Sequence, residues 1–159
     1  MKIEYHSIGV VHSPFAELKG MPIQPSGAEG IAGTIEVFPE FREGLRDLDG
    51  FSHIILLYHF HKVTEHRLQV VPFLDTELRG LFATRAPARP NPIGLSVVRL
   101  KEIQGDVLSV LGLDILDGTP VLDIKPYVTE FDGPRDVNMG WLENALKQKR
   151  KMVSDDRFK

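Results

Sequence analysis

The 159-residue sequence predicts a single domain of the all-β class, either a barrel or a sandwich. Short apolar runs recur along the chain with Gly, Pro, Asn and Asp turn signals between them, which is typical of several short strands. No G-x-G-x-x-G motif joins a strand to a helix, so a Rossmann cofactor fold is not indicated. A chain of this length that is 42% hydrophobic can bury its own core without disulfides, and it has no cysteine. The composition therefore also excludes thiolate metal sites and cysteine nucleophiles.

The first half of the sequence predicts three strands. Residues 2–11 predict a strand with a bulge, because the apolar phase shifts within the run. Residues 12–30 contain three prolines and three glycines and predict a long loop, which in a compact domain is usually functional or disordered. A second strand is expected at 31–38, a short helix at 39–48, and a strongly apolar strand at 51–63.

The second half predicts a hairpin, one further strand and a terminal helix. The segment 68–82 is ambiguous between strand and helix. Strands at 94–103 and 107–113 are joined by a Gln-Gly-Asp turn, and another strand is expected at 121–128. Between Val137 and Leu146, apolar residues recur at helical spacing and predict a helix.

The net charge of −3 argues against a protein that coats nucleic acid, which would carry a strong basic excess. One local basic patch is available in the tail, formed by Lys147, Lys149, Arg150 and Lys151. These cations also suit the C-terminal end of a helix dipole, so the patch has a structural interpretation as well. Trp141, in the same region, is expected to be a packing anchor.

No run of residues approaches the roughly 20 apolar positions that a membrane-spanning helix needs. The first residues lack the apolar core of a signal peptide. We therefore expect a cytoplasmic protein that does not bind a membrane.

The segment from Arg85 to Ser96 is the strongest functional signal. It holds three prolines, two arginines and a glycine between Arg85 and Gly94. Because proline fixes its own φ and restricts the residue before it, the segment is stiff and would present Arg85, Arg89 and Asn91 on a rigid loop. Gly94 would allow the backbone to approach another group closely. The alternative is a rigid turn between two strands.

A second dense group of polar residues lies between Leu113 and Tyr127. The pair Asp117 and Gly118 indicates a turn. Asp123, Lys125 and Tyr127 alternate along a predicted strand, so they share one face that offers a carboxylate, an amine and a phenol. The structural alternative is a strand surface with a salt bridge.

His59 and His61 form a His-x-His pair that could bind zinc, but no third ligand stands at a supporting distance. We expect no metal, and we expect these histidines and Phe60 to line a pocket or to pack. Walker A and G-x-S-x-G motifs are absent from the sequence.

Residues 84–96 (TRAPARPNPIGLS) and 116–127 (LDGTPVLDIKPY) resemble the corresponding segments of the TsaA-like (TrmO) family of tRNA N6-adenosine methyltransferases, and so do residues 12–15 and 51–54. The resemblance runs from about residue 8 to residue 127. It implies a single antiparallel β-barrel with a few short helices that binds S-adenosylmethionine without a Rossmann fold. It also implies a homodimer with the cofactor site near the subunit boundary. The implied reaction is methyl transfer to N6 of threonylcarbamoyladenosine 37 in a tRNA anticodon loop.

Longer members of this family carry a C-terminal domain, and the present sequence is expected to be a short form without it. The expected organisation is a barrel domain over residues 1–135, followed by a helix and basic tail over 136–159.

The resemblance and the side-chain chemistry together suggest roles for particular residues. Phe15 or Phe60 would make a cation–π contact with the sulfonium, and Arg85 or Arg89 would hold a carboxylate or a phosphate. The proton lost by N6 needs an acceptor, for which Asp117, Asp123 and Tyr127 are candidates. Arg89 and Lys125 are expected to bind the substrate. The expected cofactor-binding residues are Pro14, Phe15, His59, Phe60, Arg85, Asn91, Gly94, Leu95, Ile115, Leu116, Asp117 and Gly118.

Two other classes remain open at this stage. One is a methyltransferase with a different substrate, and the other is a barrel that binds S-adenosylmethionine or another ligand without turnover.

Overall fold

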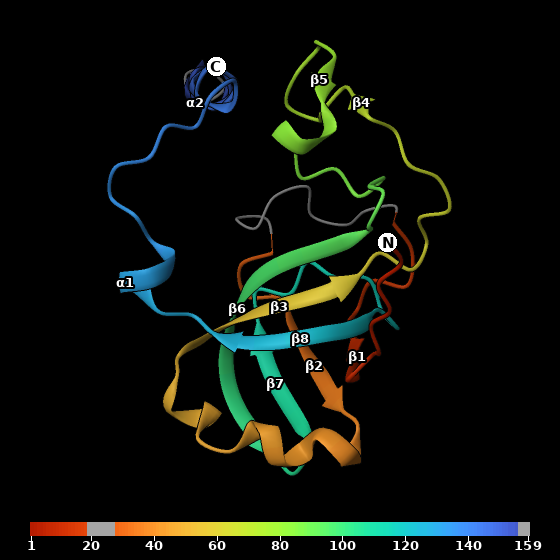
Figure 1. Ribbon diagram of the computed structural model, residues 1–159. Helices are drawn as coiled ribbons and strands as arrows, with labels where there is room; N and C mark the ends of the chain where they lie inside the picture. Colours follow the sequence, from red (N-terminus) through yellow and green to blue (C-terminus); the bar gives the residue numbers. More distant parts are fainter. Residues whose placement is uncertain (19–27, 156–159) are drawn as a thin grey trace. The chain divides into compact units, whose positions relative to one another are not determined.

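Within the part of the chain that the structure describes, six antiparallel strands close into a barrel (Figure 1). The strand order around the barrel is β1-β2-β7-β6-β3-β8. In chain order the strands are β1 (Gly9–His12), β2 (Ala32–Val37), β3 (His53–His59), β6 (Ile93–Gln104), β7 (Val107–Leu111) and β8 (Pro120–Pro126). The prediction of an antiparallel β-barrel is therefore confirmed.

The computed structural model describes the backbone of residues 1–18 and 28–155, and side chains as far as residue 148. The chain forms two compact units. The barrel unit comprises residues 1–66 and 87–128, and the second unit comprises residues 67–86 and 129–159. Part of the predicted loop 12–30 and the side chains of Lys149, Arg150 and Lys151 lie outside the described residues.

The barrel closes because its strands alternate between apolar inward positions and outward positions. The longest strand, β6, alternates strictly from Ile93 to Leu100, with every second residue buried. The interior is filled by aliphatic side chains from all six strands, as in other small barrels. Ile35, Ile54, Leu56 and Leu108 are completely inaccessible to solvent.

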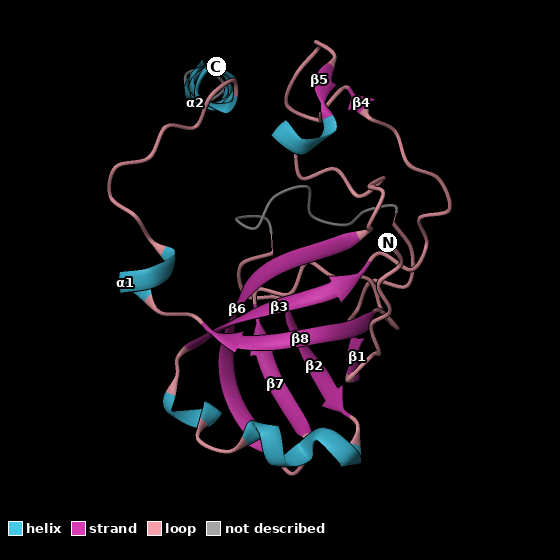
Figure 2. Ribbon diagram, in the orientation of Figure 1, coloured by secondary structure: helices cyan, strands magenta, loops and turns pink. Residues whose placement is uncertain are grey.

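The two ends of the barrel are built differently. At one end, here called the helix end, β2 leads through two 3₁₀ helices, η2 (Pro39–Leu45) and η3 (Leu48–Gly50), into β3. Figures 1 and 2 show these helices lying across that end. At the opposite end, here called the loop end, β1, β3 and β7 finish and β2, β6 and β8 begin. The connections at the loop end cover residues 13–31, 60–92 and 112–119, and the second of them contributes part of the second unit.

The second unit is assembled from two distant stretches of sequence. Its elements are β4 (Gln69–Val70), β5 (Arg79–Gly80), the 3₁₀ helix η4 (Leu81–Ala83), α1 (Thr129–Asp132) and α2 (Leu142–Asp155). Trp141 joins the two stretches, because its Nε1 donates a hydrogen bond of 2.8 Å to the carbonyl of Ala83. The guanidinium of Arg79 lies over the same indole ring at 5.6 Å. Trp141 is thus a packing anchor, as expected, but within the second unit.

Four elements differ from the sequence-based expectation. The helix expected at 39–48 is the pair η2 and η3, and the strand expected at 51–63 is limited to β3. The first strand covers only Gly9–His12, because β2 offers partners to those four residues alone. The terminal helix begins at Leu142 and not at Val137, which is 63% exposed. Gly140 precedes the helix with a positive φ of 57°, a conformation that interrupts helical geometry. No helix in the described residues is both long and apolar enough to cross a membrane.

Candidate functional site

Most of the predicted cofactor residues gather at the loop end, although they come from four separate stretches of sequence. Pro14 and Phe15 follow β1, while His59 and Phe60 stand at the end of β3. The remaining members lie before or at the start of β6 and in the connection from β7 to β8; they are Asn91, Gly94, Leu95, Ile115, Leu116, Asp117 and Gly118. The structure thus brings these residues together, and their roles in binding stay predictions.

The connection from β7 to β8 crosses the mouth of the barrel. Leu113 and Ile115 point into the core and are 0% and 2% exposed, so the segment acts as a plug. Its other face carries Asp117 and Gly118, both of which are exposed. Gly118 has a φ of 75°, and a Cβ at this position would meet no atom within 4 Å. The turn therefore has open space beside it.

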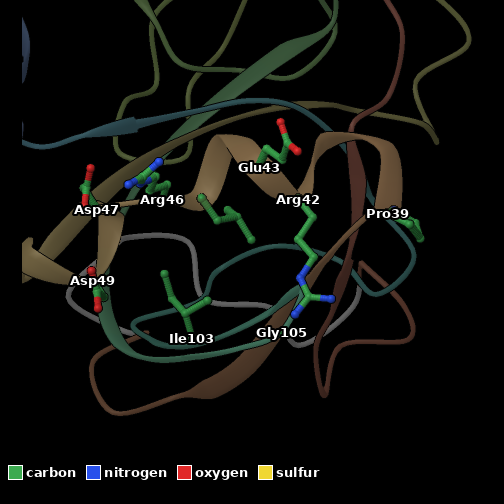
Figure 3. A pocket seen from close by; sticks show the side chains of 9 residues that line it. Pro39, Arg42, Glu43, Arg46, Asp47, Asp49, Ile103 and Gly105 are labelled. Atoms are coloured by element: carbon green, nitrogen blue, oxygen red, sulfur yellow. The ribbon is translucent and has the colours of Figure 1, made fainter.

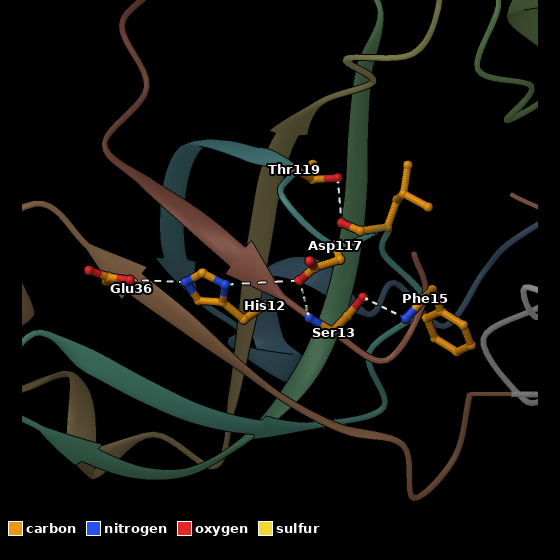
Figure 4. Close-up of polar contacts among 7 residues, drawn as sticks. His12, Ser13, Phe15, Glu36, Asp117 and Thr119 are labelled. Atoms are coloured by element: carbon orange, nitrogen blue, oxygen red, sulfur yellow. Dashed lines mark hydrogen bonds and ion pairs between the residues drawn. The ribbon is translucent and has the colours of Figure 1, made fainter. Parts of the chain in front are cut away.

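Hydrogen bonds fasten this turn to β1 and to the segment that follows it, and Figure 4 shows the one between Ser13 and Asp117. Asp117 Oδ1 accepts the N–H of Ser13 at 2.9 Å, while the N–H of Asp117 donates to the carbonyl of Phe15 at 2.8 Å. The N–H of Gly118 donates to the carbonyl of Val11 at 2.9 Å. Because these two amide groups are already bonded, the turn offers a ligand its carboxylate and its carbonyl oxygens. The arrangement suits cationic or donor groups.

His12 extends the carboxylate into a short chain of polar groups. Its Nε2 lies 2.9 Å from Glu36 Oε2, and its Nδ1 lies 3.9 Å from Asp117 Oδ1. Figure 4 shows the imidazole between the two acids. All three side chains are about half exposed. The imidazole therefore lies between the two carboxylates, hydrogen-bonded to Glu36 and 3.9 Å from Asp117.

A second chain of hydrogen bonds runs from the barrel interior to the plug. Ser96 Oγ donates to Asp114 Oδ1 at 2.7 Å and lies 3.0 Å from the hydroxyl of Tyr58. Since the single hydroxyl proton of Ser96 is committed to the carboxylate, the Tyr58 hydroxyl must donate to Ser96. Tyr58 and Ser96 are only 6% and 7% exposed. This relay, Tyr58–Ser96–Asp114, fixes the position of the plug from inside the barrel.

Gly94 has a packing role that the sequence did not suggest. A Cβ at this position would overlap the ring of Tyr58 and would meet Cζ of Phe60 at 2.8 Å. The two rings are packed edge to face, with centroids 5.4 Å apart. The group that approaches the Gly94 backbone closely is therefore an aromatic side chain of the core.

His61 stands at the same end of the barrel with a defined tautomer. The hydroxyl of Thr119 donates to the carbonyl of Leu116 at 2.7 Å, so the Nδ1 of His61, 3.3 Å from that oxygen, must be the donor. Burial, with smaller effects from Lys62 and His59, lowers the pKa of His61 below its usual 6.5. His61 is thus a neutral imidazole with an available Nε2.

The proline-rich segment is folded on itself within the barrel unit. The N–H of Arg89 donates to the carbonyl of Pro87, and the N–H of Ile93 donates to the carbonyl of Asn91, both at 2.8 Å. Such three-residue turns, together with the fixed φ of proline, hold the loop in one shape. Its predicted stiffness agrees with this geometry.

Other predicted residues lie away from the loop end. Asp123 and Lys125 form an ion pair of 2.7 Å on β8, which agrees with the structural alternative for that strand face. Tyr127 follows the far end of β8, where its ring packs against His53 with centroids 6.5 Å apart. Within one chain, the three predicted proton acceptors are therefore not brought together. Arg85 belongs to the second unit.

The helix end has a hollow of its own, of about 830 Å³ (Figure 3). It is lined by charges of both signs, from Arg42, Glu43, Arg46, Asp47 and Asp49. None of the residues predicted to be functional lies there. In the described residues, no group of three or more His, Asp or Glu is positioned to hold a metal ion.

Four residues of the loop end were not among the predicted ones. They are His12, Glu36, Ser96 and Asp114. Ser96 closes the motif segment 84–96, Asp114 lies in the polar group between Leu113 and Tyr127, and His12 opens the segment 12–15, so their positions are the signal that could have pointed to them. Glu36 carries no local signal, because its link to His12 depends on the pairing of β1 with β2.

Comparison with known proteins agrees with this geometry. Residues 10–133 match the model of the tRNA-methyltransferase O N-terminal domain. A probable S-adenosyl-L-methionine-binding protein of Pyrococcus abyssi is 57% identical over 158 residues, covering 99% of this chain and 86% of its own. A tRNA (adenine(37)-N6)-methyltransferase of Escherichia coli is 36% identical, covering 89% of this chain and 65% of its own.

The crystal structure of TrmO from Pseudomonas aeruginosa superposes with a TM-score of 0.75 at 41% sequence identity. The match covers 89% of the present chain but 63% of the crystallised one. The chain therefore spans a little under two thirds of that structure's length.

Proposed function

Because the chain belongs to the family of the tRNA-methyltransferase O N-terminal domain, we propose that it is an S-adenosylmethionine-dependent methyltransferase acting on N6 of adenosine 37 in tRNA. Relatives named for this activity and relatives named for binding the cofactor both match most of the chain. The structural observation that carries the proposal is the clustering of the predicted cofactor residues around the Asp117 turn at the loop end.

The chemistry of the loop end fits the cofactor. S-adenosylmethionine supplies a methyl group on a positively charged sulfonium and also carries an ammonium group. The Asp117 carboxylate and the carbonyl oxygens of its turn suit these cations, and the rings of Phe15 and Phe60 suit a sulfonium or an adenine. Asn91 and Arg89 add donors for the carboxylate of the amino-acid part. The positive φ of Gly118 leaves the turn unobstructed.

We assign the proton acceptor to Asp117. N6 of adenosine must lose a proton as it gains a methyl group, and an acceptor in place typically contributes 10²- to 10⁴-fold. Of the three candidates, Asp117 alone stands at the loop end. Its side chain is 47% exposed, so the proton can pass from it directly to solvent.

The finer substrate assignment is the threonylcarbamoyl form of adenosine 37, as the resemblance implies. An anticodon-loop base is already unpaired, so presenting it at the barrel mouth costs less than extracting it from a duplex. Since tRNA is the substrate, the protein would act in the cytoplasm.

We propose a homodimer that pairs through the outer faces of β3 and β6. Ile93, Leu95 and Val97 point outward from β6 and are 38%, 49% and 42% exposed. Leu57 lies opposite Leu95 and Ile55 opposite Val97, so the apolar surface continues across both strands there, while His59 lies opposite Ile93. Leu95 can contact a cofactor only from outside the barrel wall, which suits a site near a subunit boundary.

The variant Leu95→Glu should be a monomer in light scattering and should keep the circular dichroism spectrum of a β protein. An unchanged dimer would exclude this face as the interface.

The first experiment is a calorimetric titration of the protein with S-adenosylmethionine, with ATP as the control. Saturable binding of the first ligand alone, followed by a methylated adenosine in treated tRNA by mass spectrometry, is the expected result. Asp117→Asn, which keeps an oxygen for the N–H of Ser13 but removes the charge, should weaken cofactor binding and lose most turnover even when the cofactor is saturating. Full turnover in this variant would remove Asp117 as the acceptor.

The alternative is a binding protein without turnover. Relatives that match over 86% to 95% of their own length are named as S-adenosyl-L-methionine-binding proteins. In that case the cofactor would bind in the calorimeter, and no methyl group would reach tRNA.

A further inference from the structure

Charge is divided unevenly between the two units. The second unit contains ten Lys and Arg against eight Asp and Glu, whereas the barrel unit contains nine against fourteen. The basic excess of the second unit comes from residues 149–159, so by charge a polyanionic partner is repelled by the barrel unit and attracted to the end of the chain. The net charge of −3 for the whole sequence does not reveal this difference between the units.

Both acids of the β4–β5 hairpin are paired with one arginine, which leaves a single net negative charge. Arg79 Nε lies 2.7 Å from Asp75, and its Nη2 lies 3.0 Å from Glu77. The hydrogen bond from Arg79 holds the pKa of Asp75 below its usual value. Neither Arg67 nor Arg85 forms an ion pair with an acid in the described part of the chain. The hairpin thus presents two uncommitted guanidinium groups.

Large apolar side chains are exposed on the same hairpin. Phe73, in the connection between β4 and β5, is 84% exposed, and Phe82 in η4 is 75% exposed. Leu68 and Leu78 are 62% and 59% exposed. Exposed aromatic rings interleaved with arginines are the pattern used to bind unpaired nucleic acid, because bases stack on the rings while guanidinium groups meet the phosphates.

Trp141 adds the start of α2 to this surface. Its indole N–H is used by the carbonyl of Ala83 and its ring face by Arg79, so it is not available to a base. By fixing α2 on the hairpin it brings Lys147, an exposed cation of that helix, into the same unit.

We propose that this surface, made of Phe73, Arg67 and the adjoining cations of the second unit, binds a single-stranded stretch of the RNA substrate. The inference rests on the proposed function, since it names the part of the chain that holds the RNA substrate. Arg85 is left out of the tests because it is also a predicted cofactor residue.

The test measures binding of a fluorescent RNA stem-loop by anisotropy, with a fully paired duplex for comparison. Phe73→Ala should weaken stem-loop binding about fivefold or more, while Phe73→Trp should preserve it. Arg67→Ala should lower the slope of log K against log salt by roughly 0.7. The matched control is Phe41→Ala, an aromatic residue of the barrel unit that is 39% exposed, and it should change nothing.

Two outcomes would overturn the proposal. In one, Phe73→Ala binds the stem-loop as the wild type does. In the other, the same variant turns a dimer into a monomer in light scattering, which would show that a second copy covers this surface.

Failure of the proposed function is distinguishable from both. It would appear as absent calorimetric binding of S-adenosylmethionine by the wild type, and the RNA-binding variants should leave that binding unchanged.

Discussion

The two ends of the barrel share the same six strands and differ in what connects them. At the helix end the connections are a tight hairpin and two 3₁₀ helices, and the hollow there is lined by charges of both signs. At the loop end the plug and the segment after β1 are held by side chains that reach from the barrel interior and from distant strands. The comparison shows that the six strands alone close the barrel, so the connections at its ends can differ. Here the hydrogen bonds between residues remote in sequence lie at the loop end, where the predicted site residues gather.

The sharpest contrast between the ends is the tolerance of their glycines. Gly94→Ala should lower the free energy of unfolding by about 3 kcal/mol, because the new methyl group would overlap the buried ring of Tyr58. Gly44→Ala, in η2, has nothing within 4 Å of the added atom and should be neutral or stabilising by up to about 1 kcal/mol. Denaturant unfolding of both variants measures the difference. Equal changes in the free energy of unfolding would mean that the loop end tolerates an added methyl group as well as the helix end does.

The next contrast is between two serines. Ser96→Ala should cost about 2 kcal/mol, since it leaves the buried Tyr58 hydroxyl and the Asp114 carboxylate without their shared partner. Ser52→Ala at the helix end removes an exposed hydroxyl, 2.9 Å from His53 Nδ1, and should change stability by less than about 0.5 kcal/mol.

The same pair of variants tests the purpose of the relay. If Tyr58–Ser96–Asp114 holds the plug for the cofactor, Ser96→Ala should weaken S-adenosylmethionine binding even where the protein is fully folded, and Ser52→Ala should not. Unchanged affinity in Ser96→Ala would reduce the relay to a packing feature. A double-mutant cycle with Asp114→Asn would then measure its internal coupling.

The smallest expected effect is a pH dependence at the loop end. Burial lowers the pKa of His61. Below about pH 6.5, His61 is therefore protonated in the unfolded chain while it stays neutral in the folded one. The stability that depends on neutral His61 is therefore present above that pH and declines as the pH falls toward the folded-state pKa. His61→Asn should lose less stability than the wild type between pH 7.5 and 5.5 in urea titrations. Parallel curves for the two proteins would contradict this assignment.

Much of the architecture was predictable because it depends on local pattern. The apolar alternation of β6 and the Gln-Gly-Asp turn into β7 are visible in the sequence, and the structure confirms both. The limits of β1 were not predictable, since they depend on where β2 ends. The helix start at Leu142 was missed because the apolar stripe continues through a glycine whose φ is positive.

The candidate site was only partly predictable, for a similar reason. Two motif segments directed attention to the correct end of the barrel, but the partners that organise it are remote in sequence. Ser13 and Asp117 are separated by 104 positions, and Tyr58 and Ser96 by 38. The opposite placement of Asp117 and Tyr127 likewise follows from the direction of β8, which spacing along the sequence does not convey.

The Trp141 anchor has a consequence for the order in which the molecule is made. Ala83, the acceptor of the indole hydrogen bond, precedes its donor by 58 positions, and the last barrel strand lies between them. A chain leaving the ribosome can thus complete the barrel before residues 129–159, the other part of the second unit, have been synthesised. During that interval Phe73 and its neighbours are exposed beside a lone two-stranded hairpin, and this is the stage of synthesis at which a chaperone would be of most use.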